Sequence, residues 1–413
     1  MQISLLTGGG DKPYVFGLAT VLMRNGVALD IIGSDGLDSP EWHTSPGVRF
    51  LNLRGNQKVD AALGTKVSRI LMYYARLIRY SWGAKPRIFH ILWNNKFEYF
   101  DRTLLMLYYK ILGKRLVLTA HNINKGKRDS TDSILNRLTL KLQYRLCDHV
   151  FVHTEKMKRE LVEEFGGEAS AITVIPFGIN NAVPHSELTP REAKQKLGIG
   201  EAERTILFFG RIVPYKGLEY LVAAFKELLG RSACYRLIIA GRPDNDSKEY
   251  CKRIQEEIKR SNLGDRVVLK VEFVPDDETE VYFKAADVLA LPYRDIYQSG
   301  VLFLAYSFGL PVVATDVGGL REEIVEGKTG FVCMPENSDD LGRTIERYFE
   351  SGLYKGLNEF RRDIRAYARE RYSWDKVGQL TVSMYTKLVE KWSPHESSRE
   401  VASSSRKTTA GHS

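Results

Sequence analysis

Two cations and two glycines stand between a strand and a helix near the middle of the chain, in the segment Gly210 to Gly217. The apolar residues 205–209 before it predict a buried strand, and apolar residues from Leu218 onward recur with the spacing of one helix face. Glycines at such a turn let backbone amides approach a ligand, while Arg211 and Lys216 can neutralise the oxygens of a diphosphate. The segment therefore predicts a phosphate-binding turn.

A second phosphate-binding feature is the start of the helix expected at residues 300–308. Gln298 and Ser299 precede this helix, and Gly300 is its first residue. A helix start offers free amides and the positive end of the helix dipole, so Ser299, Gly300 and Val301 can hold a phosphate. With Arg211 and Lys216 they can enclose a diphosphate from two sides. The attached group then faces the first half of the chain.

The first half of the chain places polar residues and glycines after two of its expected strands. His121 and Asn122 follow the strand expected at 116–120, and Gly8, Gly9 and Gly10 follow the one at 3–7. Ligands bind at the carboxyl ends of the strands in an open parallel sheet. The glycines lack the G-x-G-x-x-G spacing that NAD binding requires, so they either approach a sugar or acceptor or form a simple tight turn.

Composition and charge narrow the classes of protein. The 413 residues are enough for two domains, and the formal charge of +9 favours an anionic partner such as a nucleotide-linked substrate or an anionic lipid. Nucleic-acid binding is not expected, because the sequence contains no recognisable nucleic-acid module. The four cysteines are scattered without CxxC pairs, which predicts reduced core cysteines rather than a zinc site.

Apolar strands and amphipathic helices alternate in both halves, which predicts an α/β fold with two parallel sheets flanked by helices. We expect a first domain at 1–183 and a second at 205–370. A polar linker is expected at 184–204, where Pro184 and Pro190 lie. Residues 371–392 predict a last helix that can cross back to the first domain, and the Ser- and Lys-rich tail 393–413 is expected to be disordered.

Two segments of the first half, residues 66–87 and 102–115, interleave Lys and Arg with Leu, Tyr and Trp. Helices of this kind suit the headgroup region of an anionic membrane, or they pack on a sheet while their cations extend to water. Both interpretations stay open. The N-terminus does not have the pattern of a secretory signal and no stretch is apolar for long enough to span a bilayer, so we expect a cytoplasmic protein. Under the membrane interpretation it is peripheral on the inner face of the plasma membrane.

The ordered set of motifs resembles the retaining glycosyltransferases of the GT-B fold, specifically glycosyltransferase group 1, family 4. The resemblance runs from about residue 1 to 390. The motifs that carry it are GRIVPYKG at 210–217, AADVLALPY at 285–293, SGVLFLAYSFGLPVVATDVGGLREEI at 299–324, TAHN at 119–122 and VIPFGIN at 174–180.

The resemblance implies two Rossmann-like parallel-sheet domains facing a cleft. It also implies a UDP- or GDP-sugar donor and a saccharide or lipid-linked acceptor, in cell-envelope or exopolysaccharide synthesis, with no cofactor. Gly8, Gly9, Gly10 and Asn122 are then candidates for the acceptor side.

Roles for individual residues follow from the same resemblance. Arg211 and Lys216 would bind the donor diphosphate and stabilise the charge of the leaving group, and His121 would orient a hydroxyl of the transferred sugar. Transfer in this family keeps the anomeric configuration. It is thought to use front-face attack, in which a donor phosphate oxygen accepts the acceptor proton, so a dedicated protein base is not required.

This sequence departs from the family at one point. The family commonly carries two glutamates eight positions apart, and here those positions hold Ile296 and Leu304. Asp295 and Gln298 are the nearest polar candidates for contact with sugar hydroxyls, and Glu322 and Glu323 lie on the next motif. The departure keeps two alternatives open: a non-catalytic nucleotide-sugar-binding partner subunit, and a sugar-nucleotide epimerase of the same fold.

The sequence Asp244-Asn245-Asp246 matches the D-x-D pattern that binds a metal-nucleotide complex in another glycosyltransferase fold. Here it precedes an expected helix, and capping of that helix by Asp246 or Ser247 accounts for it. We therefore expect no metal.

Overall fold

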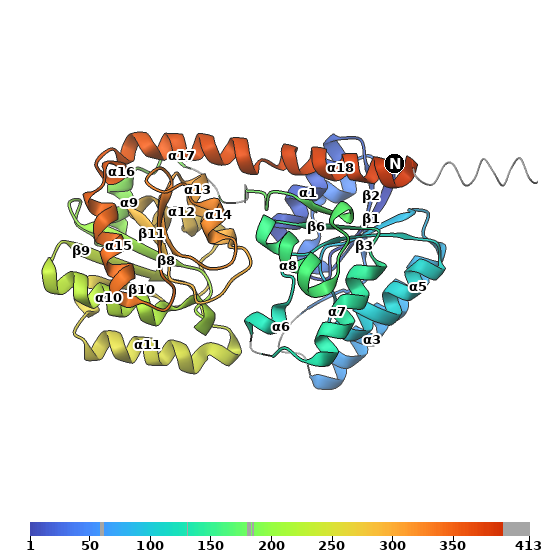
Figure 1. The fold of residues 1–413 in the computed structure, drawn as a ribbon, viewed down its shortest axis with the longest axis horizontal. Helices are drawn as coiled ribbons and strands as arrows, with labels where there is room; N and C mark the ends of the chain where they lie inside the picture. The colour runs from blue at the N-terminus through green and yellow to red at the C-terminus, as the bar shows by residue number, and fades with distance from the viewer. Residues whose placement is uncertain (58–61, 130, 180–182, 184–185, 391–413) are drawn as a thin grey trace, which may run out of the picture.

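The computed structural model describes residues 1–390, apart from residues 58–61, 130, 180–182 and 184–185. Two parallel sheets, each covered by helices, lie side by side along the long axis of the molecule (Figure 1). The expected α/β fold class with two parallel sheets is confirmed. The tail 393–413 and part of the expected linker lie outside the described residues.

The first sheet has seven strands in the order β3-β2-β1-β4-β5-β6-β7. Every neighbouring pair in it is parallel. Its central strands are buried on both faces, so most of their residues are apolar, with Ser4 and His90 as buried polar exceptions. Its strands are β1 Gln2–Leu6, β2 Ala28–Gly33, β3 Val48–Asn52, β4 Ile88–Ile91, β5 Arg115–Thr119, β6 His149–Val152 and β7 Ile172–Val174.

Helices connect these strands. The first begins at Lys12, because Asp11 accepts a hydrogen bond from the Tyr14 amide and Pro13 suits a first turn. The helices of this half are α1 Lys12–Arg24, α2 Pro40–Thr44, α3 Leu63–Gly83, α4 Glu98–Phe100, α5 Met106–Ile111, α6 Lys125–Arg128, α7 Ile134–Leu146 and α8 Glu155–Phe165, with a π-helical turn, η2, at Asp101–Leu105.

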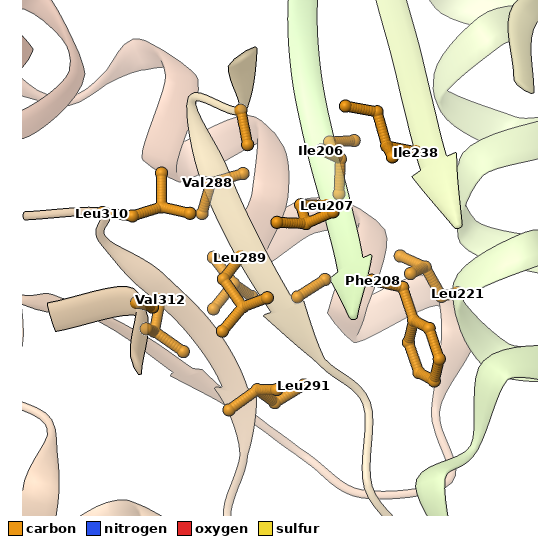
Figure 2. Close-up of a cluster of buried hydrophobic side chains, with 14 of the residues drawn as sticks. Ile206, Leu207, Phe208, Leu221, Ile238, Val288, Leu289, Leu291, Leu310 and Val312 are labelled. Atoms are coloured by element: carbon orange, nitrogen blue, oxygen red, sulfur yellow. The ribbon is translucent and has the colours of Figure 1, made fainter. Parts of the chain in front are cut away.

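The second sheet has six parallel strands in the order β10-β9-β8-β11-β12-β13. Figure 2 shows how Ile206, Phe208, Leu289 and Val312 from adjacent strands pack into one core. Its strands are β8 Arg204–Phe209, β9 Tyr235–Ala240, β10 Val267–Lys270, β11 Val288–Leu291, β12 Val312–Thr315 and β13 Gly330–Cys333.

The expected linker 184–204 contains a helix, α9 Pro190–Lys196. Pro190 occupies the first turn rather than breaking the chain, and Thr189 and Glu192 form a reciprocal capping box. Ala193 and Lys194 are buried, and Lys194 forms an ion pair with Asp287. The helix packs against α12, Asp276–Ala285, of the second half.

The remaining helices cover the second sheet and then return to the first. They are α10 Leu218–Arg231, α11 Lys248–Arg260, α12 Asp276–Ala285, α13 Gly300–Ser307, α14 Leu320–Glu323, α15 Ser338–Glu350, α16 Gly352–Lys355, α17 Leu357–Tyr372 and α18 Trp374–Glu390. Figure 1 shows α17 and α18 (red) running along one side of the molecule, α17 over the second sheet and α18 over the first.

Helix α18 packs against α1 at the start of the chain. The Trp374 indole donates to the Ile179 carbonyl at 2.8 Å, and the Tyr385 hydroxyl lies 2.5 Å from Nδ1 of His90 in β4. A Cβ on Gly17 would lie 2.0 Å from the Trp374 ring, so the absence of a side chain there lets α18 approach. Among the described residues, no helix is long and apolar enough to cross a membrane.

Candidate active site

A cavity of about 430 Å³ lies between the carboxyl ends of the two sheets. Eight residues singled out in the sequence line it together: His121, Asn122, Arg211, Lys216, Gln298, Ser299, Gly300 and Val301. The first two follow β5 of the first sheet. Of the other six, Arg211 and Lys216 follow β8, Gln298 and Ser299 lie in the loop after β11, and Gly300 and Val301 begin α13. The fold thus brings both halves of the chain to one site.

The glycine-containing turn places Lys216 in the cavity wall. Gly210 has φ +99° and a Cβ there would lie 3.0 Å from Lys216 Nζ, so the glycine leaves room for the ammonium group. Lys216 is 6% exposed, and its Nζ lies 5.3 Å from the centre of the Tyr293 ring. Burial, with a smaller contribution from nearby Arg211, lowers the pKa of Lys216 to about 7.

Arg211 is held at the edge of the same cavity by residues of the second half. Its Nη1 donates to Asp244 at 3.0 Å and its Nη2 lies 3.3 Å from the Tyr215 hydroxyl. The prediction that Asp246 or Ser247 caps the next helix is wrong, because Ser247 is at the N-cap without a side-chain cap bond. Asp244 instead positions the guanidinium, and the described residues contain no group of His, Cys, Asp or Glu that could hold a metal ion.

The start of α13 faces the two cations. Ser299 is the N-cap, but its side chain makes no capping bond, so the first amides of α13 have no side-chain acceptor. Gly300 is exposed and Val301 half-exposed at this end. A phosphate between Lys216 and α13 would receive amide hydrogen bonds and ammonium charge together.

His121 is enclosed by aromatic rings of the first half. Its ring stacks on Trp93 with centroids 4.2 Å apart, and the Tyr14 ring meets it edge-on at 4.7 Å. Its Nδ1 lies 3.0 Å from His153 Nε2, while its own Nε2 has no hydrogen-bond partner. Burial, followed by electrostatic coupling to the His153 ring, lowers the pKa of His121 well below its ordinary value, so the His121 ring is neutral at pH 7.

The glycines Gly8, Gly9 and Gly10 do not line this cavity. They line a neighbouring one of about 260 Å³, which shares His121 and Asn122 with the first. A Cβ on Gly10 would lie 2.0 Å from the Trp93 ring, so the turn fits directly against the residue that stacks on His121. The acceptor-side candidates therefore adjoin the site from the first sheet.

Asp295 does not line either cavity. Ile296 and Leu304, which stand where the family commonly has glutamates, do line the first cavity and give it an apolar stretch of wall. Gln298 is the polar residue beside them: its Nε2 donates to Glu323 at 3.2 Å, and its Oε1 is buried without a partner. Glu323 is buried against Tyr372, so Gln298 is the member of this group that reaches the cavity.

Several lining residues were missed from the sequence. Arg128 is one of them: α6 places it in the wall, with its guanidinium 4.7 Å from the centre of the Tyr215 ring. Asp11 and Trp374 also line the cavity, from the two ends of the chain. The Asp-x-Pro start of α1 was a readable signal for Asp11, whereas the places of Arg128 and Trp374 depend on tertiary packing.

Glu322 was considered beside the candidates for contact with sugar hydroxyls, but its carboxylate binds the start of a helix in the first half. Its carboxylate accepts from the amides of Glu155 and Lys156 at 3.1 and 3.0 Å, so a residue of the second half caps α8 of the first. Tyr297 makes a second connection: it packs in the core of the first half and its hydroxyl lies 2.8 Å from Glu160. These contacts bring the two halves together around the cavity.

Comparison with known proteins identifies the class. The profile of the glycosyl transferases group 1 matches residues 190–371, and that of glycosyltransferase family 4 matches residues 8–183. The chain belongs to the group 1, family 4 glycosyltransferases with the GT-B fold, and is a glycosyltransferase. An uncharacterized glycosyltransferase of Methanocaldococcus jannaschii is 27% identical over 394 residues, covering 91% of this chain and 94% of that protein.

Solved structures share the fold. Sucrose-phosphate synthase from Thermosynechococcus elongatus superposes with a TM-score of 0.76 at 19% identity. The superposition covers 95% of this chain and 100% of the synthase chain. Anabaena HepE, solved in complex with UDP-glucose, superposes with a TM-score of 0.73 at 19% identity over 94% of this chain and 100% of that one.

Proposed function

We propose that this glycosyltransferase moves a sugar from a UDP- or GDP-sugar to a saccharide or lipid-linked saccharide acceptor. The observation that carries the proposal is the convergence of Arg211, Lys216 and the uncapped start of α13 on one wall of the cavity, opposite His121. The UDP-glucose complex of the HepE fold relative supports a nucleotide-sugar ligand.

The geometry suits departure of a nucleoside diphosphate. Negative charge grows on the leaving diphosphate in the transition state, and cations fixed beforehand at that place lower the barrier selectively. Lys216 is buried and Arg211 is held by Asp244, so both are oriented before a donor binds. His121 presents an unpartnered Nε2 to the sugar side, where it accepts a hydrogen bond from a hydroxyl.

Retention follows in this proposal from attack on the face that the diphosphate leaves. A donor phosphate oxygen accepts the acceptor proton, and the acceptor enters from the side of Gly8 to Gly10 and Asn122. We place the step in cell-envelope or exopolysaccharide synthesis, on the basis of the family resemblance alone.

The apolar side chains at Ile296 and Leu304 are the observation that favours two alternatives, a nucleotide-sugar-binding partner subunit without activity and an epimerase of the same fold. Incubation with UDP- and GDP-sugars and a saccharide or lipid extract separates the three. Released nucleotide with a lengthened acceptor supports transfer, an epimerised donor supports the epimerase, and saturable binding without turnover supports the partner subunit. Unchanged turnover in Arg211→Ala and Lys216→Ala would contradict the proposed mechanism.

We also propose that the first half contacts an anionic membrane surface. Apolar side chains are exposed on α3, α5 and α7, which lie near one another in Figure 1; Trp82 is 75%, Ile111 82% and Ile134 80% exposed. Arg76 and Arg79 are exposed on α3 among them. Cations beside exposed apolar side chains suit an anionic headgroup layer.

Vesicle binding tests this second proposal. Sedimentation with phosphatidylglycerol vesicles should weaken when Arg76 and Arg79 are replaced by Gln, and should weaken with added salt. Binding that persists unchanged in both conditions would remove the electrostatic basis of the proposal.

A further inference from the structure

A basic cavity of about 250 Å³ lies in the first half, away from the diphosphate-binding wall. Arg54 from the loop after β3, Lys66 and Arg69 from α3, and Lys96 from the loop after β4 line it. No carboxylate lines it among the described residues, and these four cations form no ion pair there. Four cations around a small volume repel one another, so the arrangement is stabilised when an anion enters.

Arg54 provides an unused donor in this basic cavity. Its Nη1 is buried and has no hydrogen-bond partner, although a buried guanidinium nitrogen normally finds an acceptor. Its guanidinium lies 5.1 Å from the centre of the Tyr73 ring, and this contact fixes the plane of the group. The nearest interacting carboxylate, Asp101, is already bonded to Tyr74 and Asn95.

Arg54 also connects the basic cavity to the active site. A Cβ on Gly9 would lie 2.2 Å from Arg54 Nη1, so the guanidinium packs directly on the Gly8 to Gly10 turn. The other side of that turn packs on Trp93, which stacks on His121. The basic cavity and His121 are therefore joined through direct contacts of Arg54, one glycine turn and Trp93.

We infer that the basic cavity binds a phosphate group of the acceptor, which deepens the proposed function and rests on it. Phosphate fits better than carboxylate, because it carries up to two charges and more acceptor oxygens for two guanidinium and two ammonium groups. The phosphate belongs either to a small phosphorylated sugar or polyol or to a lipid headgroup. In both cases an acceptor hydroxyl extends from it toward the donor.

Direct binding measurements test the inference without requiring turnover. The probes are glucose 6-phosphate and vesicles of phosphatidylcholine with phosphatidylinositol, each titrated into the full chain with the diphosphate site saturated by UDP or GDP. In Lys66→Gln/Arg69→Gln, we expect affinity for the phosphate-bearing probe to fall by about tenfold or more, since charged hydrogen bonds are lost. For glucose 6-phosphate, Arg76→Gln/Arg79→Gln, on the same helix but outside the basic cavity, is the matched control and should keep the wild-type affinity.

The two probes distinguish the sources of the phosphate. Saturable binding of glucose 6-phosphate that depends on Lys66 and Arg69 supports a small phosphorylated acceptor. Vesicle binding that needs phosphatidylinositol and depends on the same pair supports a lipid headgroup. No saturable binding of either probe, or equal losses of glucose 6-phosphate affinity in the two double variants, would overturn the inference.

Nucleotide binding separates this inference from the proposed function. Thermal shifts with UDP and GDP should be the same in wild type and in Lys66→Gln/Arg69→Gln. If nucleotide binds but neither phosphate probe does, the acceptor inference fails and the proposed function stands. If no nucleotide binds at all, the proposed function fails first.

Discussion

His153 Nε2 lies 3.0 Å from His121 Nδ1, and His153 Nδ1 lies 3.2 Å from the Ile175 carbonyl oxygen. A carbonyl only accepts, so the hydrogen of His153 is on Nδ1. Burial lowers the pKa of His153 to about 4, and burial also lowers the pKa of His121, so both rings are neutral at pH 7. His153 Nε2 must then accept from His121 Nδ1, which leaves His121 Nε2 as an acceptor.

Replacement of His153 tests this hydrogen bond between the two rings and the tautomer that it gives His121. His153→Leu removes the acceptor, so His121 should adopt the tautomer with hydrogen on Nε2, and kcat should fall by roughly tenfold or more because a sugar hydroxyl no longer finds an acceptor. His153→Gln keeps an amide oxygen for His121 and an amide hydrogen for Ile175, and should retain most activity. Nitrogen-15 NMR of the His121 ring reports the tautomer. A wild-type His121 with hydrogen on Nε2 would contradict the predicted tautomer.

Nucleotide affinity should depend on pH through Lys216. In the empty site its pKa is about 7, so the ammonium group is charged below pH 7 and becomes neutral above it. Affinity for UDP or GDP should therefore fall as pH rises from 6 to 9, with proton uptake on binding near pH 8. Calorimetry in buffers of different ionisation enthalpy measures that uptake. Lys216→Arg stays charged and should remove this pH dependence.

The same pKa predicts the sign of a stability change without ligand. The pKa of Lys216 is lower in the folded chain than in the unfolded one, so the unfolded chain binds more protons between about pH 7 and pH 10. The contribution of Lys216 to the free energy of unfolding should become more favourable as pH rises through that range. Chemical denaturation of wild type and Lys216→Met at pH 7 and pH 9 checks the sign; a larger gain in Lys216→Met would contradict it.

Arg128 should contribute to the rate of sugar transfer, although it lies on the first half of the molecule whereas Arg211 and Lys216 lie on the second. Its guanidinium lies over Tyr215 and within the cavity wall, where a diphosphate or its attached sugar can reach it. Arg128→Lys loses the planar stacking and should lower kcat/KM by about tenfold, since charged contacts typically contribute 1.5–3 kcal/mol. Lys127→Gln, on the same turn but paired with Glu164 at the surface, is the control. Equal activities of the two variants would exclude a role for Arg128.

Glu322 should stabilise the contact between the halves. It caps α8 from α14, and loss of a helix cap costs about 1 kcal/mol. Glu322→Ala should lower the thermal midpoint and increase the radius of gyration in X-ray scattering without UDP. The control is Glu326→Ala, which removes an ion pair to Arg347 within the second half. An unchanged radius in Glu322→Ala would show that the other contacts suffice.

Local sequence could predict the site residues that lie within a single strand-to-helix turn. Arg211, Lys216 and Ser299 lie next to glycines at strand ends or helix starts, and such positions follow from hydrophobic periodicity. Arg128, Tyr297 and Glu322 could not be placed in this way, because each acts on the other half of the molecule. The helix α9 was missed for a local reason: Pro190 was taken for a breaker when it starts the helix.

The crossing of α18 onto α1 has a consequence for biosynthesis. The ribosome makes the seven-stranded sheet early. Val21 of α1 and Gly178 pack against residues of α18, and these partners emerge only with the last part of the described chain. Native packing of the N-terminal half must therefore wait until α18 has been translated, unlike the usual order in which N-terminal domains finish first. Nascent chains stalled before Trp374 should leave the α1 face sensitive to protease, and release of α18 should protect it.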